Sequence, residues 1–109
     1  MSGRSDSDLA VMARRGNTQA YGELVQRFQS AVFSVCYQLV GERAEAEDLA
    51  QDAFIRAYWH LDQFNPSLPF GPWVRRIAAN LYINRLHAHK ELQMPLEDEV
   101  YGPPPDDPS

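Results

Sequence analysis

Residues that break helices divide this sequence into four segments. Gly16 with Asn17, and Gly41, interrupt runs in which apolar residues recur every three or four positions, and residues 62–72 contain three prolines and one glycine. Apolar residues at that spacing are typical of amphipathic helices, and a regular helix does not continue through a proline-rich run. We therefore expect helices over about residues 7–15, 18–40, 44–61 and 72–89. The expected caps or first residues are Asp6 or Ser7, Thr18 and Pro72.

The predicted fold class is all-α, a small bundle of one short and three longer helices. A length of 109 residues fits one domain, which we place at residues 5–90, after a disordered start at residues 1–4. Residues 91–109 are acidic and rich in proline, and they hold too few apolar side chains to fold by themselves. We expect them to be a linker toward a C-terminal domain that this sequence does not contain.

Charge is distributed unevenly along the chain. The net charge of −5 argues against a protein that coats nucleic acid without selectivity. Residues 42–62 are acidic, whereas residues 63–90 carry Arg75, Arg76, Arg85 and Lys90 and no acid at all. An acidic helix followed by a basic segment indicates two surfaces that meet two different partners.

Catalytic and metal-binding patterns are missing from the sequence. It has no glycine-rich phosphate loop, and its histidines do not have the spacing of a metal site on one helix face. The single Cys36 excludes an internal disulfide and a cysteine-based metal site. Asp48 and Asp52 are four residues apart, but no companion acid supports a catalytic pair. We expect no enzymatic activity, no cofactor, no metal and no membrane segment, and a cytoplasmic location.

The helix expected over residues 44–61 has one face of mixed character. Asp48, Gln51, Asp52, Ile55 and Trp59 gather on one side, opposite a stripe of small and aromatic residues that includes Tyr58. Aromatic anchors surrounded by polar groups are typical of protein interfaces. The sequence therefore favours a protein-docking face, and the alternative is an ordinary surface helix with one stray tryptophan.

The basic segment and the proline-rich run before it have the residues of a nucleic-acid site. Arginines bind phosphates, Asn80 has the amide to read a base edge, and aromatic side chains stack on unpaired bases. Candidates for stacking are Phe64, Phe70, Trp73 and Tyr82, with Asn65 beside them. Two alternatives stay open: the phenylalanines either anchor the loop to the core or build a stiff pocket, and Trp73 is either core or contact.

The runs Ala46–Tyr58, Phe64–Pro66 and Trp73–Leu86 resemble conserved region 2 of bacterial sigma factors, and most of all the extracytoplasmic-function group. The resemblance covers about residues 5–90. It implies docking on the clamp helices of core RNA polymerase and capture of a flipped base of the single-stranded non-template −10 promoter element. It also implies an anti-sigma factor as a further partner.

The resemblance assigns residues to both surfaces. Those implied for polymerase docking are Asp48, Leu49, Gln51, Asp52, Ile55 and Trp59. Those implied for DNA binding are Asp62, Gln63, Phe64, Asn65, Ser67, Arg75, Arg76, Asn80, Ile83 and His87.

Four positions depart from the family pattern. Trp59 stands where a polar residue is usual, Ala79 and His87 stand where arginines are frequent, and Asn84 replaces an acid. Fewer arginines imply weaker phosphate contact. A helical module that docks on polymerase or an anti-sigma factor without recognising DNA is therefore the alternative, and the net charge argues against a free-standing duplex binder.

Overall fold

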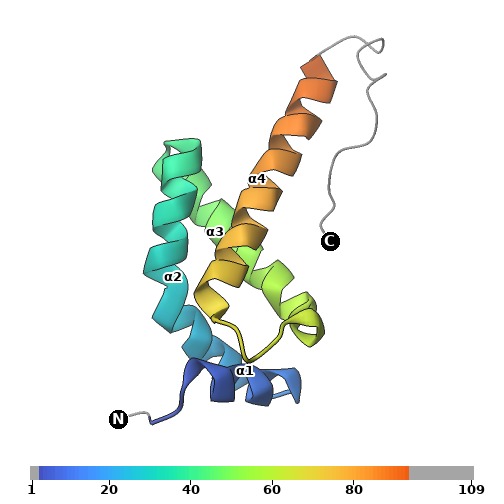
Figure 1. Cartoon of the computed structure of the whole chain (residues 1–109). Helices are drawn as coiled ribbons and strands as arrows, with labels where there is room; N and C mark the ends of the chain where they lie inside the picture. Colours follow the sequence, from blue (N-terminus) through green and yellow to red (C-terminus); the bar gives the residue numbers. More distant parts are fainter. Residues whose placement is uncertain (1–2, 94–109) are drawn as a thin grey trace.

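The computed structural model describes residues 3–93, with side chains to residue 90, and within that range it contains helices and no strand (Figure 1). The all-α prediction is confirmed. The elements are α1 (Asp6–Arg14), α2 (Thr18–Val40), α3 (Arg43–Trp59), the short 3-10 helix η1 (Leu61–Gln63) and α4 (Phe70–Gln93). Most of the linker predicted for residues 91–109 lies outside the described residues.

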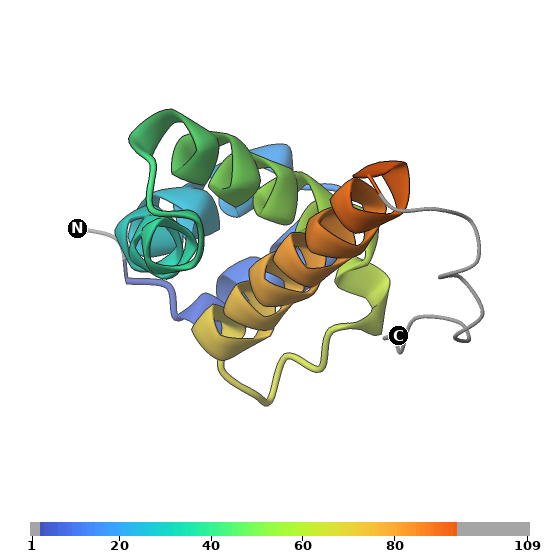
Figure 2. The same ribbon diagram turned by 90° about the horizontal axis from the view of Figure 1, so that it is seen from above.

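The helices form one bundle with α1 across its foot (Figures 1 and 2). α2 packs against both α3 and α4, and α3 packs against α4 as well, while α1 contacts α2, α4 and η1. Figure 1 shows the C-terminal turns of α4 extending past the ends of α2 and α3. The far end of α4 therefore presents more of its circumference to solvent than its first turns do.

Polar side chains cap the first two helices one residue or more before the predicted positions. Ser5 accepts a hydrogen bond from the Asp8 backbone N–H at 3.0 Å, and Asn17 accepts one from the Ala20 N–H at 3.0 Å. Thr18, predicted as a cap, is instead the first residue of α2. Either side chain suits a cap, and the preceding asparagine takes the role here. Gly41 ends α2 as predicted, in the left-handed conformation at φ 74°.

The fourth helix starts earlier and ends later than predicted. It begins at Phe70, so that Pro72 is its third residue and not its first, and it continues to Gln93. A proline in the first turn costs little because the N–H groups there have no partner within the helix.

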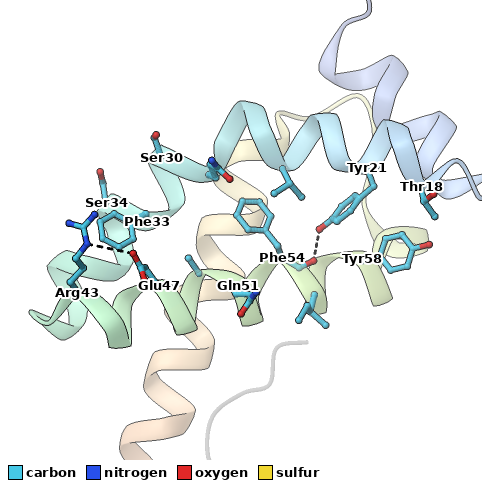
Figure 3. A pocket seen from close by; sticks show the side chains of 14 residues that line it. Thr18, Tyr21, Ser30, Phe33, Ser34, Arg43, Glu47, Gln51, Phe54 and Tyr58 are labelled. Atoms are coloured by element: carbon cyan, nitrogen blue, oxygen red, sulfur yellow. Dashed lines mark hydrogen bonds and ion pairs between the residues drawn. The ribbon is translucent and has the colours of Figure 1, made fainter.

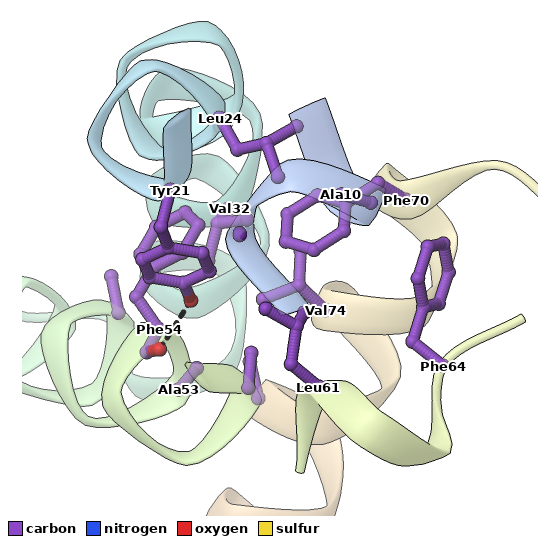
Figure 4. Packing of buried hydrophobic residues seen from close by; sticks show 14 of the residues in the cluster. Ala10, Tyr21, Leu24, Val32, Ala53, Phe54, Leu61, Phe64, Phe70 and Val74 are labelled. Carbon is purple, nitrogen blue, oxygen red and sulfur yellow. Dashed lines mark hydrogen bonds between the residues drawn. The ribbon is translucent and has the colours of Figure 1, made fainter. Parts of the chain in front are cut away.

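The core is built around Phe70, whose side chain is 1% exposed (Figure 4). Its ring centroid lies 5.4 Å from that of Phe28 and 5.6 Å from that of Phe64, with Trp73 at 5.8 Å. Phe64 and Phe70 are the two ends of the loop, so the loop is anchored to the core at both ends. Of the two uses predicted for these phenylalanines, the structure shows the anchoring one.

The inner face of helix α3 is made mostly of alanine. Ala46, Ala53 and Ala57 are completely buried. Tyr21 of α2 crosses to α3, where its hydroxyl donates a hydrogen bond to the backbone carbonyl of Phe54 (Figure 4). Burial, and next to it the neighbouring Tyr58, raises the pKa of Tyr21. Tyr58, placed by the sequence on the core side, is 39% exposed and packs at the edge against Tyr21.

Candidate functional site

The outer face of α3 carries four of the predicted docking side chains on the surface. Trp59 is 65% exposed and Ile55 45%, Gln51 is exposed, and the Asp48 side chain is 69% exposed. An exposed tryptophan and isoleucine beside polar groups form a surface suited to a protein partner. The prediction that Leu49 contacts polymerase is wrong. Its side chain is completely buried in the core and cannot meet a partner.

One guanidinium joins the two aspartates of this face to α4. The Nη2 atom of Arg85 lies 3.2 Å from Oδ2 of Asp48 and 3.1 Å from Oδ2 of Asp52. Asp52 also pairs with Arg56 at 3.6 Å and is the more covered acid, with its side chain 31% exposed. The aspartates therefore stay open to solvent while they hold α3 against α4.

A groove of about 940 Å³ runs between α2 and α3, beside the docking face (Figure 3). Gln51 and Ile55 belong to both surfaces. At one end Arg43 lies over the Phe33 ring, 5.6 Å from its centroid, and pairs with Glu47 at 3.5 Å. The lining residues are Thr18, Tyr21, Val25, Gln29, Ser30, Phe33, Ser34, Arg43, Glu47, Ala50, Gln51, Phe54, Ile55 and Tyr58. Sequence reasoning missed this groove because it depends on how two helices meet.

The loop over residues 64–69 is held in one shape by a local turn. The Asn65 Oδ1 atom accepts hydrogen bonds from the Ser67 N–H at 3.0 Å and the Ser67 hydroxyl at 2.8 Å. The Leu68 N–H donates to the Asn65 carbonyl at 2.9 Å. This is an Asx turn, in which an asparagine side chain substitutes for a backbone acceptor. The loop is therefore ordered before it meets any partner.

Helix η1 and the outward side of the loop hold four of the predicted DNA-binding residues, together with one exposed apolar side chain that the sequence pattern did not indicate. Asp62 and Gln63 on η1, and Asn65 and Ser67 in the loop, are exposed. Leu68 is 58% exposed at the tip, where no periodic pattern could mark it. The prediction that Phe64 stacks on a base is wrong for this conformation. Its side chain is only 4% exposed, and its ring centroid lies 4.8 Å from that of Trp73.

The predicted DNA-binding residues of α4 recur every three or four positions, so most of them share one side of the helix. Arg76 and Ile83 are exposed and Asn80 and His87 are half-buried. Arg75 is half-buried beside the loop end: its Nη1 atom lies 3.4 Å from where a Cβ would stand on Gly71. Trp73 is partly buried and packs against the core, so of its two predicted roles, core or DNA contact, the structure shows the core one.

A cation from α1 also reaches this region, and sequence reasoning missed it. The Nη2 atom of Arg14 lies 3.5 Å from the backbone carbonyl oxygen of Asp62, 48 residues further along the chain. Nothing in the local pattern around Arg14 indicates a contact at that separation.

In the described part of the chain no cluster of three or more potential metal ligands occurs. A search of the same residues for a helix long and apolar enough to cross a membrane finds none.

The bundle, the mixed face of α3 and the ordered loop define a sigma-factor domain. A family model, Sigma-70 region 2, matches residues 24–91, and the chain belongs to this family. Its members are transcription initiation factors and not enzymes, in agreement with the prediction.

Among the relatives, the ECF RNA polymerase sigma factor SigW of Bacillus subtilis is 39% identical over 89 residues, covering 82% of this chain and 47% of SigW. The ECF RNA polymerase sigma-E factor of Escherichia coli is 36% identical over 84 residues, covering 77% of this chain and 44% of that protein. The chain thus spans less than half the length of these relatives.

Two solved structures share the fold. An engineered region 2 of sigmaE in complex with GTAAAA, determined by NMR, matches with a TM-score of 0.77 and 34% identity, covering 86% of this chain and 100% of that one. CnrH in complex with the cytosolic domain of CnrY matches with a TM-score of 0.67 and 34% identity, covering 72% of this chain and 51% of that one.

Proposed function

We propose that this chain binds core RNA polymerase through α3 and recognises the single-stranded non-template strand of a −10 promoter element through the loop and α4. The observation that carries the proposal is the separation of two surfaces on one rigid bundle. The outer face of α3 is acidic and aromatic, whereas the loop and α4 present amides and arginines. A cytoplasmic location follows from these two partners.

The proposed docking of α3 on polymerase is supported by the exposure of Trp59 and Ile55 on the same face as Asp48. Large apolar side chains in a polar ring supply most of the affinity at protein interfaces, and charges beside them select a basic partner. Because Arg85 holds Asp48 and Asp52 toward α4, the acids occupy one fixed place on this face. The polymerase surface that docks here is therefore basic, with an apolar recess for Trp59.

The DNA half is supported by the prepared shape of the loop. With Asn65 Oδ1 engaged by Ser67, the free polar group of Asn65 is its amide NH₂, a donor to base acceptors. Pulling a base out of a duplex costs a few kcal/mol, and a loop that is already ordered adds little further entropy cost. The domain carries few phosphate-binding cations, so polymerase must supply the remaining binding energy.

The relative in complex with GTAAAA supports single-stranded DNA as the ligand of this fold. The other relative, bound to CnrY, supports an anti-sigma factor as a second protein partner. We place that partner on the groove between α2 and α3, which shares Gln51 and Ile55 with the docking face. An anti-sigma factor bound there competes with polymerase for these two side chains.

A pull-down with core polymerase tests the docking half. Asp48→Arg reverses a charge whose side chain is 69% exposed, so it is expected to abolish capture of polymerase while the lost ion pair with Arg85 lowers the free energy of unfolding by at most about 1 kcal/mol. Gln38→Arg adds a positive charge at an exposed position of α2 outside the docking face and is expected to leave capture unchanged. Equal capture by both variants would contradict the proposal. Capture of polymerase by a chain that shows no preference for any single-stranded sequence would instead identify a docking module without DNA recognition.

A further inference from the structure

The C-terminal end of α1 lies against the segment that leads into the loop. Leu9, Ala10 and Ala13 bury the inner face of α1 in the core, and α1 contacts both η1 and α4. Figure 1 shows α1 at the foot of the bundle, where η1 and the loop return toward α4. The last turn of α1 is therefore part of the same region of the surface as Asp62 and Gln63.

Two exposed arginines end this helix. Arg14 and Arg15 are adjacent in sequence and both are exposed. One donor nitrogen of Arg14 points to the Asp62 carbonyl at 3.5 Å, which leaves the other donors of a planar guanidinium open toward solvent. A basic residue in a last turn also offsets the helix dipole, but that role requires no approach to η1.

The loop consequently has cations at both ends. Arg14 stands at η1, which precedes the loop, and Arg75 stands beside Gly71, which follows it. Beside Arg14, Asp62 presents an exposed carboxylate, which repels phosphates but accepts hydrogen bonds from base amino groups. A guanidinium next to Asp62 reduces that repulsion within the screening distance of about 8–10 Å at ordinary salt.

From this juxtaposition we infer that Arg14 and Arg15 form a phosphate-binding site on α1, which holds the backbone of single-stranded nucleic acid next to the nucleotide taken by the loop. The inference rests on the proposed function and adds α1 to a surface otherwise made of η1, the loop and α4. The ligand is the phosphodiester and not a base, so the site contributes affinity without sequence preference.

Salt dependence tests this directly. Each phosphate contact to a single strand contributes about 0.7 to the slope of log K against log salt concentration. The slope is measured by fluorescence anisotropy with the 109-residue chain and labelled GTAAAA, between about 50 and 200 mM salt. Arg14→Ala and Arg15→Ala are each expected to flatten the slope by about 0.7, with the same loss of affinity for GTAAAA and for a scrambled hexamer.

Two further variants separate a phosphate contact from a structural role. Arg4→Ala removes the same charge just before the N-terminus of α1, a helix that rises about 12 Å from Asp6 to Arg14 at 1.5 Å per residue, and should leave the slope unchanged. Arg14→Lys keeps a cation that binds phosphate as a point charge and should restore most of the slope.

The outcomes are distinct. If wild-type protein prefers GTAAAA and neither Arg14→Ala nor Arg15→Ala alters the slope, the α1 site is wrong and the proposed function stands. If Arg14→Ala lowers the preference for GTAAAA and keeps the slope, Arg14 positions the loop and does not bind phosphate, which also overturns the inference. If wild-type protein shows no preference between GTAAAA and the scrambled hexamer, the proposed DNA recognition fails, whereas the α1 phosphate site stands if Arg14→Ala and Arg15→Ala flatten the slope and falls if they do not.

Discussion

Arg85 of α4 and Asp52 of α3 are joined by an ion pair with a 3.1 Å Nη2–Oδ2 distance, 33 residues apart in sequence. The pair links the helix with half of the predicted DNA-binding side chains to the helix that carries the docking face. Because the same nitrogen also contacts Asp48, the pair fixes where both acids stand. Internal packing and the proposed docking therefore share these side chains.

Exchanging the charges of Asp52 and Arg85 should distinguish the role of this ion pair in stability from its role in docking. Asp52→Arg and Arg85→Asp are each expected to lower the free energy of unfolding by about 1 kcal/mol, because like charges then meet at a half-exposed site. The double variant restores an ion pair between the two positions but leaves like charges facing Asp48 and Arg56, so it should recover part of that loss. Urea unfolding measures the stability of all three. The double variant still presents a reversed charge at position 52, so it should fail to capture polymerase. Full capture would show that the acid at 52 has only an internal role.

Trp59 is expected to be the anchor of the docking face. Trp59→Ala removes a side chain that is 65% exposed, so the free energy of unfolding should change by less than about 0.5 kcal/mol. Polymerase affinity should fall at least about 30-fold, the loss of roughly 2 kcal/mol typical of an interface anchor. Tyr37→Ala truncates another exposed aromatic on α2 and serves as the control in the same titration. Similar losses for both would indicate a general effect of aromatic surface and not a docking site.

The side chain of Asn65 should contribute more to the preference for GTAAAA than the hydroxyl of Ser67, which completes the Asx turn. Asn65→Ala removes the acceptor of both Ser67 hydrogen bonds and the amide available to a base. Ser67→Ala removes only the hydroxyl bond and keeps the backbone one. We expect Asn65→Ala to lose most of the preference for GTAAAA over a scrambled hexamer, and Ser67→Ala to lose a small part of it, by anisotropy. The reverse order would exclude Asn65 as a base contact.

Tyr21 predicts a dependence of stability on alkaline pH. Its pKa is raised in the folded state, so above pH 10 the unfolded chain loses the phenolic proton while the folded chain keeps it. Stability is therefore complete below pH 10 and declines as pH rises above it. Tyr21→Phe should cost about 1 kcal/mol at neutral pH through the lost bond to the Phe54 carbonyl, and it should flatten the decline. Urea titrations at several pH values measure both effects. An identical alkaline decline in the two proteins would assign it to other groups.

The sequence predicted the helices well because apolar periodicity and helix breakers are local signals. Ile55 and Trp59 were placed correctly on the surface of α3 for the same reason. Leu49 and Phe64 were misplaced, since a resemblance assigns a position a role without showing whether its side chain points inward. The contacts of Arg85 with Asp52, and of Arg14 with Asp62, join residues 33 and 48 positions apart, and only the packed bundle brings such residues together.

The most direct test of two surfaces on one bundle is a titration of labelled single-stranded GTAAAA with core RNA polymerase and this chain together. The wild-type chain is expected to make polymerase bind GTAAAA more tightly than a scrambled hexamer. Asp48→Arg should remove that gain, whereas binding of each oligonucleotide by the isolated chain should not change. A complex that binds both oligonucleotides equally, or a preference that Asp48→Arg leaves intact in the presence of polymerase, would contradict the division between docking face and DNA surface.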